Sequence, residues 1–114
     1  MVQADAEFSK YEQDLRKGVL VLAVLAELRT TRYGYSLRQA LIERGMPIEE
    51  GTLYPLLRRL ETQGLLESQW QVDGGPPRRY YSLSDRGAEM CRNLSSSWAS
   101  LAAVMDRLLE GEPE

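Results

Sequence analysis

Residues 51–66 read GTLYPLLRRLETQGLL, and the fold can be predicted outward from this stretch. Its leucines recur at intervals of three and four residues, the spacing of one face of an amphipathic helix. Opposite and beside the leucines lie Gly51, Thr52, Tyr54, Pro55, Arg58, Arg59 and Thr62. We predict a helix that buries Leu53, Leu56, Leu57 and Leu60, ends at Gly64, and presents a cationic outer face. That face is either merely solvated or a binding surface.

The start of this helix has two solutions. A helix that begins at Glu50 would contain Pro55, which lacks a backbone N–H, and would lose one hydrogen bond there. A helix capped by Thr52 would place the proline in its first turn and avoid that loss. The sequence leaves both starts open.

Two further helices are expected upstream. The pattern becomes helical from about Lys10 to Leu28, and we expect this first helix to be mostly core, with residues 1–9 flexible. Its apolar stripe consists of Leu15, Val19, Leu22 and Ala26, widened by Val21, Leu25 and Leu28. After a polar break at residues 30–33, a second helix begins at Gly34 or at Ser36, which has capping-box spacing to Gln39. Its inner face carries Leu37, Ala40 and Leu41, and it ends near Arg44 and Gly45.

Downstream of Gly64 the pattern changes to alternation. LLESQWQ at 65–71 places Leu66, Ser68 and Trp70 on one face of a strand, and RRYYSLS at 78–84 alternates Arg79, Tyr81 and Leu83 with Tyr80 and Ser82. The turn between them is VDGGPP, so the two strands form a hairpin with arginines beside its tip. A hairpin that follows such a helix is a wing, which predicts a mainly α fold with a small β-hairpin, the winged helix-turn-helix.

A last helix should run from Ser84, its N-cap, to about Leu109, followed by a solvated tail, GEPE. Its apolar residues are separated alternately by three and four positions, as at the seam of a coiled coil: Cys91, Leu94, Trp98, Leu101, Met105 and Leu108. We prefer self-association of this helix over packing within its own domain. The expected organisation is a winged helix domain at 1–83 continuous with a dimerisation helix at 84–110.

Composition restricts the function. The 114 residues suffice for one domain and carry a net charge of −3, but residues 15–45 hold six basic and two acidic side chains, so a positive face remains possible. We expect a cytoplasmic protein without a membrane span or signal peptide, in agreement with the lone Cys91. With no histidine and one cysteine, neither a Ser-His-Asp site nor a zinc knuckle can be built, so we expect no enzyme, metal or cofactor.

The combination of GTLYPLLRRLE, then GLL, then R-Y-Y-x-L-x-x-x-G from Arg79 to Gly87 resembles the PadR family of bacterial transcriptional regulators. The similarity covers about residues 10–109, and the short C-terminal part resembles the small subfamily with one dimerisation helix. One departure is Glu49, where many relatives place a serine that caps the recognition helix.

The resemblance implies a homodimer whose recognition helices enter successive major grooves of a pseudo-palindromic operator on double-stranded DNA. The residues that it places toward DNA are Tyr35, Thr52, Tyr54 and Arg58 on the helices and Arg78 and Arg79 on the wing. For Arg58 we favour a phosphate contact over a guanine edge, whereas Tyr54 is either a phosphate ligand or a ring partly buried against the core. The alternative function is a winged-helix protein-interaction module that does not bind DNA.

Trp98 has a second interpretation. Twofold symmetry would bring two copies of its indole together with Leu15 and Val19 of the first helix, and an apolar slot between two indoles suits a planar aromatic cation. Small PadR regulators that sense multidrug compounds place a tryptophan similarly, which supports an effector site here. The other interpretation of Trp98 is a residue that only packs.

Overall fold

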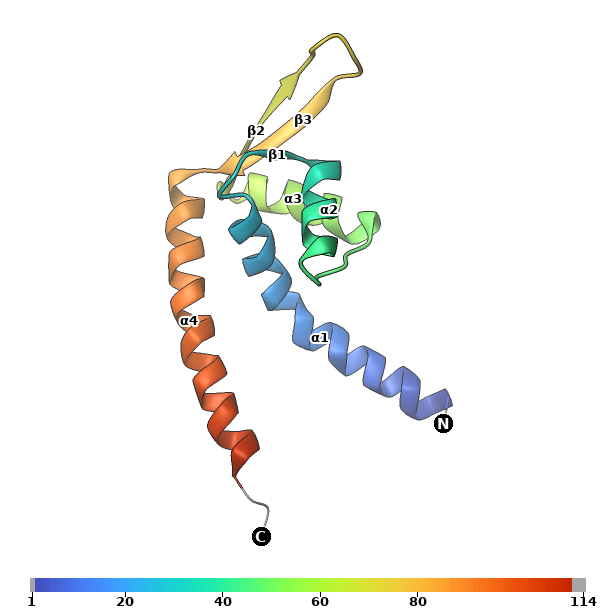
Figure 1. Ribbon diagram of the computed structural model, residues 1–114, viewed down its shortest axis with the longest axis vertical. Coiled ribbons are helices and arrows are strands. Elements are labelled where there is room, and N and C mark those ends of the chain that lie inside the picture. Colours follow the sequence, from blue (N-terminus) through green and yellow to red (C-terminus); the bar gives the residue numbers. More distant parts are fainter. Residues whose placement is uncertain (1, 112–114) are drawn as a thin grey trace.

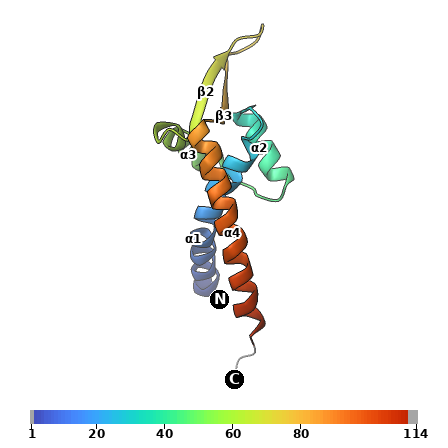
Figure 2. The same cartoon turned by 90° about the vertical axis from the view of Figure 1, so that its left-hand side faces the viewer.

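The computed structural model describes residues 2–111, and no helix among them is long and apolar enough to cross a membrane. The elements, in chain order, are α1 (Val2–Glu27), β1 (Arg32–Tyr33), α2 (Gly34–Glu43), α3 (Glu50–Thr62), β2 (Leu66–Gln71), β3 (Arg78–Leu83) and α4 (Asp85–Glu110). The molecule is elongated, 64 × 36 × 24 Å. The hairpin projects from one end of the helical body, and α1 and α4 extend from the other (Figures 1 and 2). This architecture confirms the winged helix-turn-helix.

Helix α3, the helix predicted from residues 51–66, buries the predicted leucines. Leu53 and Leu57 are fully buried, Leu60 is 2% exposed and Leu56 is 8% exposed. It begins at Glu50 with Glu49 as its N-cap, which answers the question of its start, and Pro55 therefore lies inside the helix on the exposed side. The helix ends in a Schellman motif at Gly64, whose φ is +80°. In that motif the N–H of Leu65 donates to the carbonyl of Leu60 at 2.9 Å.

The hairpin pairs β2 and β3 antiparallel, with Ser68 opposite Tyr81 and Trp70 opposite Arg79. The predicted alternation is confirmed by the burial of Leu66 and Tyr81 on the inner face of the sheet. The sheet has a third strand that was not predicted, because β1 takes up part of the expected polar break and pairs with β3, giving the order β1-β3-β2. A strand of two residues is too short to show any alternation in sequence.

Helix α2 begins at Gly34 with Tyr33 as its N-cap, and no side chain caps it. The alternative start at Ser36, with a capping box to Gln39, is wrong. Leu37 and Leu41 are buried as predicted, and Gly45, with a φ of +90°, ends the helix in a second Schellman motif. A short loop then connects α2 to α3.

Helix α1 differs most from the prediction. It begins at Val2 rather than near Lys10, and in the single chain it is not mostly core. Leu15, which we predicted to be buried, is 75% exposed, whereas Val24 and Leu25 near the C-terminal end of α1, and Leu28 just after it, are buried. Apolar spacing alone does not say which part of a long helix meets the body of the domain. The expected flexibility of residues 1–9 stays a prediction, and Met1 lies outside the described residues.

Helix α4 begins as predicted: the Oγ of Ser84 accepts a hydrogen bond from the N–H of Gly87 at 3.0 Å. The same hydroxyl donates to the carbonyl of Gly64 at 2.6 Å, so α4 starts against the end of α3. Cys91 is buried in the core, but the stripe beyond it is exposed in the single chain, with Trp98 at 50% and Leu101 at 60%. The last part of the predicted tail, residues 112–114, lies outside the described residues.

Candidate nucleic-acid interface

The outer face of α3 carries the predicted contact residues Thr52 and Arg58, and both are exposed. Among residues 2–111 Arg58 makes no ion pair, so its guanidinium is available to an external anion. Of the acids on or beside this helix, Glu49 and Glu50 lie at its N-terminal end, and Glu61, on its last turn, pairs with Arg79. A duplex that approached α3 would therefore meet a cation in the middle of the helix and carboxylates at its start.

Tyr54 is half-buried and packs against the hydrophobic core. A β-carbon placed on Gly34 would lie 2.6 Å from its Cε1 atom, so the ring of Tyr54 occupies the space that a side chain at residue 34 would need. Of the two interpretations of Tyr54, the ring is partly buried against the core, and a phosphate contact by its hydroxyl stays a prediction. Its contact with Gly34 also fixes how closely α2 approaches α3.

An aromatic cluster joins the start of α2 to the wing. The Tyr33 and Tyr35 rings stack with centroids 6.3 Å apart, and Tyr80 meets Tyr33 edge-on at 5.5 Å. The guanidinium of Arg78 lies 4.6 Å from the centre of the Tyr33 ring. Two predicted residues, Tyr35 and Arg78, are thus brought together through Tyr33, whose part the sequence analysis missed. Tyr35 remains 57% exposed at the edge of this cluster.

Arg79, the second predicted wing residue, is held within the protein. Its Nη2 donates to Oε1 of Glu61 at 2.8 Å, and its Nε donates to Oγ of Ser68 at 3.0 Å. The guanidinium also lies near the rings of Trp70, at 5.8 Å, and Tyr81, at 5.6 Å. Burial raises the pKa of the Tyr81 phenol above its ordinary value, although the positive charge of Arg79 opposes that shift. Arg79 therefore connects the wing to α3.

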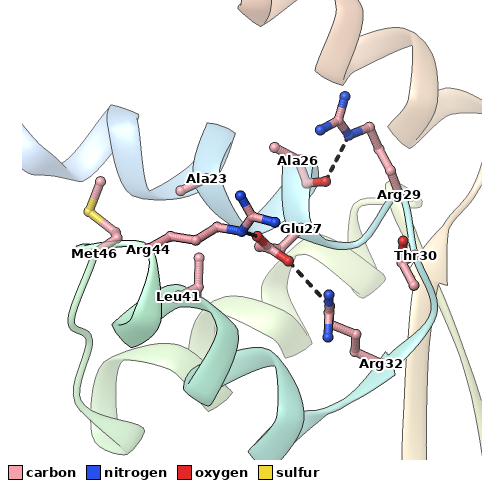
Figure 3. A pocket seen from close by; sticks show the side chains of 9 residues that line it. All are labelled: Ala23, Ala26, Glu27, Arg29, Thr30, Arg32, Leu41, Arg44 and Met46. Carbon is pink, nitrogen blue, oxygen red and sulfur yellow. Dashed lines mark hydrogen bonds and ion pairs between the residues drawn. The ribbon is translucent and has the colours of Figure 1, made fainter.

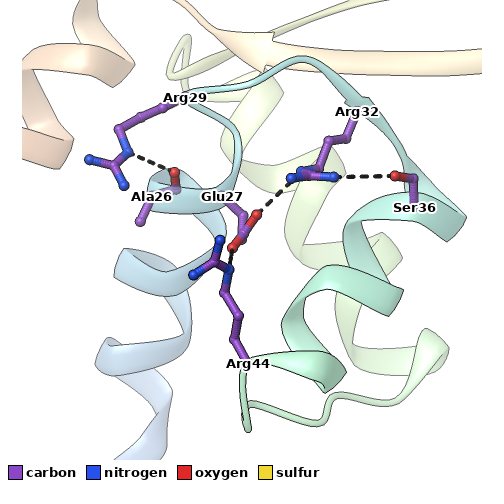
Figure 4. Close-up of polar contacts among 6 residues, drawn as sticks. All are labelled: Ala26, Glu27, Arg29, Arg32, Ser36 and Arg44. Atoms are coloured by element: carbon purple, nitrogen blue, oxygen red, sulfur yellow. Dashed lines mark hydrogen bonds and ion pairs between the residues drawn. The ribbon is translucent and has the colours of Figure 1, made fainter.

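A depression of about 610 Å³ lies between the end of α1 and α2 (Figure 3). Beside it the carboxylate of Glu27, 10% exposed, pairs with Arg32, at 3.2 Å between Nε and Oε2, and with Arg44 (Figure 4). The Nε of Arg29, on the rim, donates to the carbonyl of Ala26 at 2.9 Å. These contacts tie α1, β1 and the end of α2 together, so we assign the cluster to the packing of the three elements. No local pattern predicts it, because Glu27 and Arg44 lie on different helices and meet only in the folded chain.

Most of the residues predicted for self-association and for an effector are exposed in the single chain. Along α4 the exposed fractions are 50% for Trp98, 60% for Leu101, 46% for Met105 and 66% for Leu108, while Leu94 is half-buried. Leu15 is exposed and Val19 half-buried on α1. Because α1 and α4 diverge toward their free ends (Figure 1), the stripe on α4 has no cover from α1 there. Exposed apolar stripes of this length are typical of interaction surfaces.

Comparisons with known proteins agree on one family. The sequence model of the transcriptional regulator PadR-like family matches residues 21–93. A PadR family transcriptional regulator from Eggerthella lenta, known as a crystal structure, is 43% identical, with a TM-score of 0.87, over 98% of this chain and 100% of that one. A PadR-like regulator from Bacillus cereus is 33% identical, with a TM-score of 0.79, over 87% and 99% of the two chains. A transcriptional regulator from Mycobacterium tuberculosis is 44% identical over 48% of this chain and 51% of that protein.

Proposed function

Because the chain belongs to the PadR-like family of transcriptional regulators, we propose that it binds a pseudo-palindromic operator on double-stranded DNA as a homodimer and acts as a repressor that a small ligand releases. The proposed DNA contacts are Tyr35, Thr52, Tyr54, Arg58 and Arg78. Membership of this family supports a role in the regulation of transcription. The operator, the homodimer, repression and the ligand are our own inferences.

The observation that carries DNA binding is the outer face of α3, where Arg58 and Thr52 are exposed on a helix whose other face is anchored by four buried leucines. Such a helix fits the major groove, and Arg58 would hold a phosphate there, the commoner contact for arginine. Arg78 on the wing and Tyr35 at the start of α2, which meet through Tyr33, would extend this surface. Phosphate contacts from these elements would fix the position of α3 on the duplex.

The homodimer is supported by the uncovered stripe on α4. Leu101 and Leu108 are more than half exposed, at heptad positions that in a coiled coil face a second helix. A second copy of the chain would supply the same stripe, as an isologous interface requires. Dimerisation would also place two copies of α3 at a fixed spacing, which is how a twofold operator is read.

The ligand site is inferred at the same interface. Trp98 is larger than the aliphatic residues that usually fill a two-helix seam, so two copies either pack closely or hold a space open. A planar aromatic cation would fit between the indoles, with Leu15 and Val19 as apolar walls. Its effect on DNA binding would come from a preference for one spacing of the two recognition helices.

One observation favours a different function. The net charge of −3 is unusual for a DNA-binding domain, and a winged helix that has turned to protein recognition would have no need of a basic surface. A mobility-shift assay on the DNA upstream of the chain's own operon, repeated over a salt series, separates the two. A specific complex whose log K falls linearly with log salt supports our proposal. No shift with any upstream fragment at low salt would favour the protein-interaction module.

A further inference from the structure

We propose that Glu61 is a positioning residue for DNA binding, which holds the wing at a fixed angle to the recognition helix α3 through Arg79 and Ser68. This inference rests on the proposed DNA-binding function and deepens it. It gives Arg79 the task of orienting the wing in place of a phosphate contact. By charge alone, Glu61 would weaken DNA binding and Arg79 would strengthen it. In this proposal the two side chains act together to hold the wing in place.

The three side chains close a ring of hydrogen bonds. The carboxylate of Glu61, on the last turns of α3, accepts from Arg79 through Oε1 at 2.8 Å and from the Ser68 hydroxyl through Oε2 at 2.5 Å. The Ser68 hydroxyl oxygen in turn accepts from Nε of Arg79 at 3.0 Å. Each group contacts both of the others, so none can rotate without breaking two contacts. Bonds of this kind to ionised groups are stronger than those between neutral groups.

The ring links α3 to both strands of the wing. Ser68 lies on β2 and Arg79 on β3, and both face α3, where Glu61 is their common partner. Arg79 is further confined by the rings of Trp70 and Tyr81. The Glu61 and Arg79 side chains are only 27% and 36% exposed, which limits screening by solvent. Since the outer part of the hairpin extends beyond the helical body (Figure 1), the contacts that Ser68 and Arg79 make with α3 set the direction in which it points.

The sign of one substitution separates this proposal from simple electrostatics. Glu61 carries a negative charge between the two elements that would approach DNA, so removal of that charge alone should strengthen binding to a polyanion. If Glu61 positions the wing, the same removal should weaken specific binding, because the wing loses its fixed angle. Glu67 provides the matched control, since it is an exposed acid on β2 that makes no ion pair among the described residues.

The first experiment compares Glu61→Gln and Glu67→Gln in the full-length protein, with the operator fragment selected by the mobility-shift assay. We expect Glu61→Gln to weaken specific binding about ten-fold, the size expected for lost hydrogen bonds to a charged group, and Glu67→Gln to leave it equal or slightly stronger. Arg79→Gln should weaken binding by a similar factor, and the double variant by no more than either single one, because the residues act as a unit. Equal or tighter binding by Glu61→Gln would overturn the proposal.

A second measurement requires no DNA. In a Trp98→Phe background Trp70 is the remaining tryptophan, and it lies directly across from Arg79 on the wing. We expect Glu61→Gln to lower the fluorescence anisotropy of Trp70 while the melting temperature changes little, and Glu67→Gln to leave both unchanged. If the wild-type protein binds no duplex, the proposed DNA-binding function is wrong. The anisotropy of Trp70 then still tests whether Glu61 orders the wing. An unchanged anisotropy in Glu61→Gln would refute that role.

Discussion

The α-carbon of Gly87 lies so close to Leu65 that a β-carbon on it would stand 1.9 Å from the Leu65 carbonyl oxygen. This approach lets the first turn of α4 sit against the end of α3, where the N–H of Ser84 donates to the same carbonyl at 3.1 Å. The glycine that ends the R-Y-Y-x-L-x-x-x-G motif is therefore required by close packing of backbone against backbone.

We expect Gly87→Ala to destabilise the protein by about 3 kcal/mol, or roughly 10 °C in melting temperature, because α4 would have to shift away from Leu65. Gly51→Ala is the control, since a β-carbon there meets nothing within 4 Å. Calorimetry should find Gly51→Ala unchanged or slightly more stable. A Gly87→Ala variant as stable as the wild type would mean that the contact relaxes without cost.

The sequence was sufficient wherever a periodic pattern and a local signal agreed. The leucines of α3, its end at Gly64 and the Ser84 cap were all predicted, because each depends on residues within one or two turns. β1 was missed, since its pairing with β3 joins residues far apart in the chain. The prediction that α1 is mostly core was wrong for a related reason. The spacing of Leu15 and Val19 indicates an apolar helix face, but it does not say whether that face packs against this chain or another.

The residues of the candidate site also fall into those that the sequence predicts and those that it does not. The exposure of Thr52 and Arg58 could be predicted because it follows from their place opposite the leucines of α3. The engagement of Arg79 by Glu61 could not, because the two are 18 residues apart and meet only when the hairpin folds back on α3. The alternation of the strand assigned Arg79 to a face, but nothing local identified what that face would meet.

A test of assembly uses the exposed stripe on α4. Leu101→Arg should place a charge in the proposed seam and convert the dimer to a monomer, and because Leu101 lies outside the core of the single chain, the winged domain should remain folded. Ala103→Arg adds the same charge on the opposite side of the helix and should remain dimeric. Light scattering with circular dichroism distinguishes the two, and a dimeric Leu101→Arg protein would place the seam elsewhere.

The proposed DNA contacts can be tested through salt dependence. Arg58→Ala and Arg78→Ala should each weaken operator binding and reduce the slope of log K against log salt by about 0.9, the loss of one phosphate contact. Arg92→Ala, an exposed arginine on α4, serves as the control and should change neither quantity. Affinities and slopes equal to those of the wild type in both variants would remove the two arginines from the interface.

Tyr81 makes stability depend on alkaline pH. Its pKa is raised in the folded protein, chiefly by burial, so the folded state favours the protonated phenol. The stabilisation is complete below the ordinary tyrosine pKa of about 10 and is lost as the pH rises through the raised value. Tyr81→Phe should therefore lose less unfolding free energy than the wild type between about pH 9 and pH 11. Urea titrations of both proteins at the two pH values measure the unfolding free energies. Equal losses of unfolding free energy in the wild type and in Tyr81→Phe would contradict the effect of burial on Tyr81.

The last prediction concerns the proposed effector site at Trp98. This side chain is half exposed in one chain and would approach its symmetry mate across the seam, so an aromatic cation stacked between the two indoles should quench their emission. Planar aromatic cations titrated into the dimer should quench tryptophan fluorescence, and the same compounds should weaken operator binding by the factor that separates their affinities for the free and DNA-bound dimers.

The second tryptophan, Trp70 on the wing, makes the assignment testable, because it is 64% exposed and would also respond to a compound that binds nonspecifically. With Trp70→Phe the quenching should persist, since only the wing signal is removed. With Trp98→Ala it should disappear, together with the effect of the compound on DNA binding. Quenching that survives Trp98→Ala and disappears with Trp70→Phe would locate the compound at the wing, and Trp98 would then be a residue that only packs at the seam.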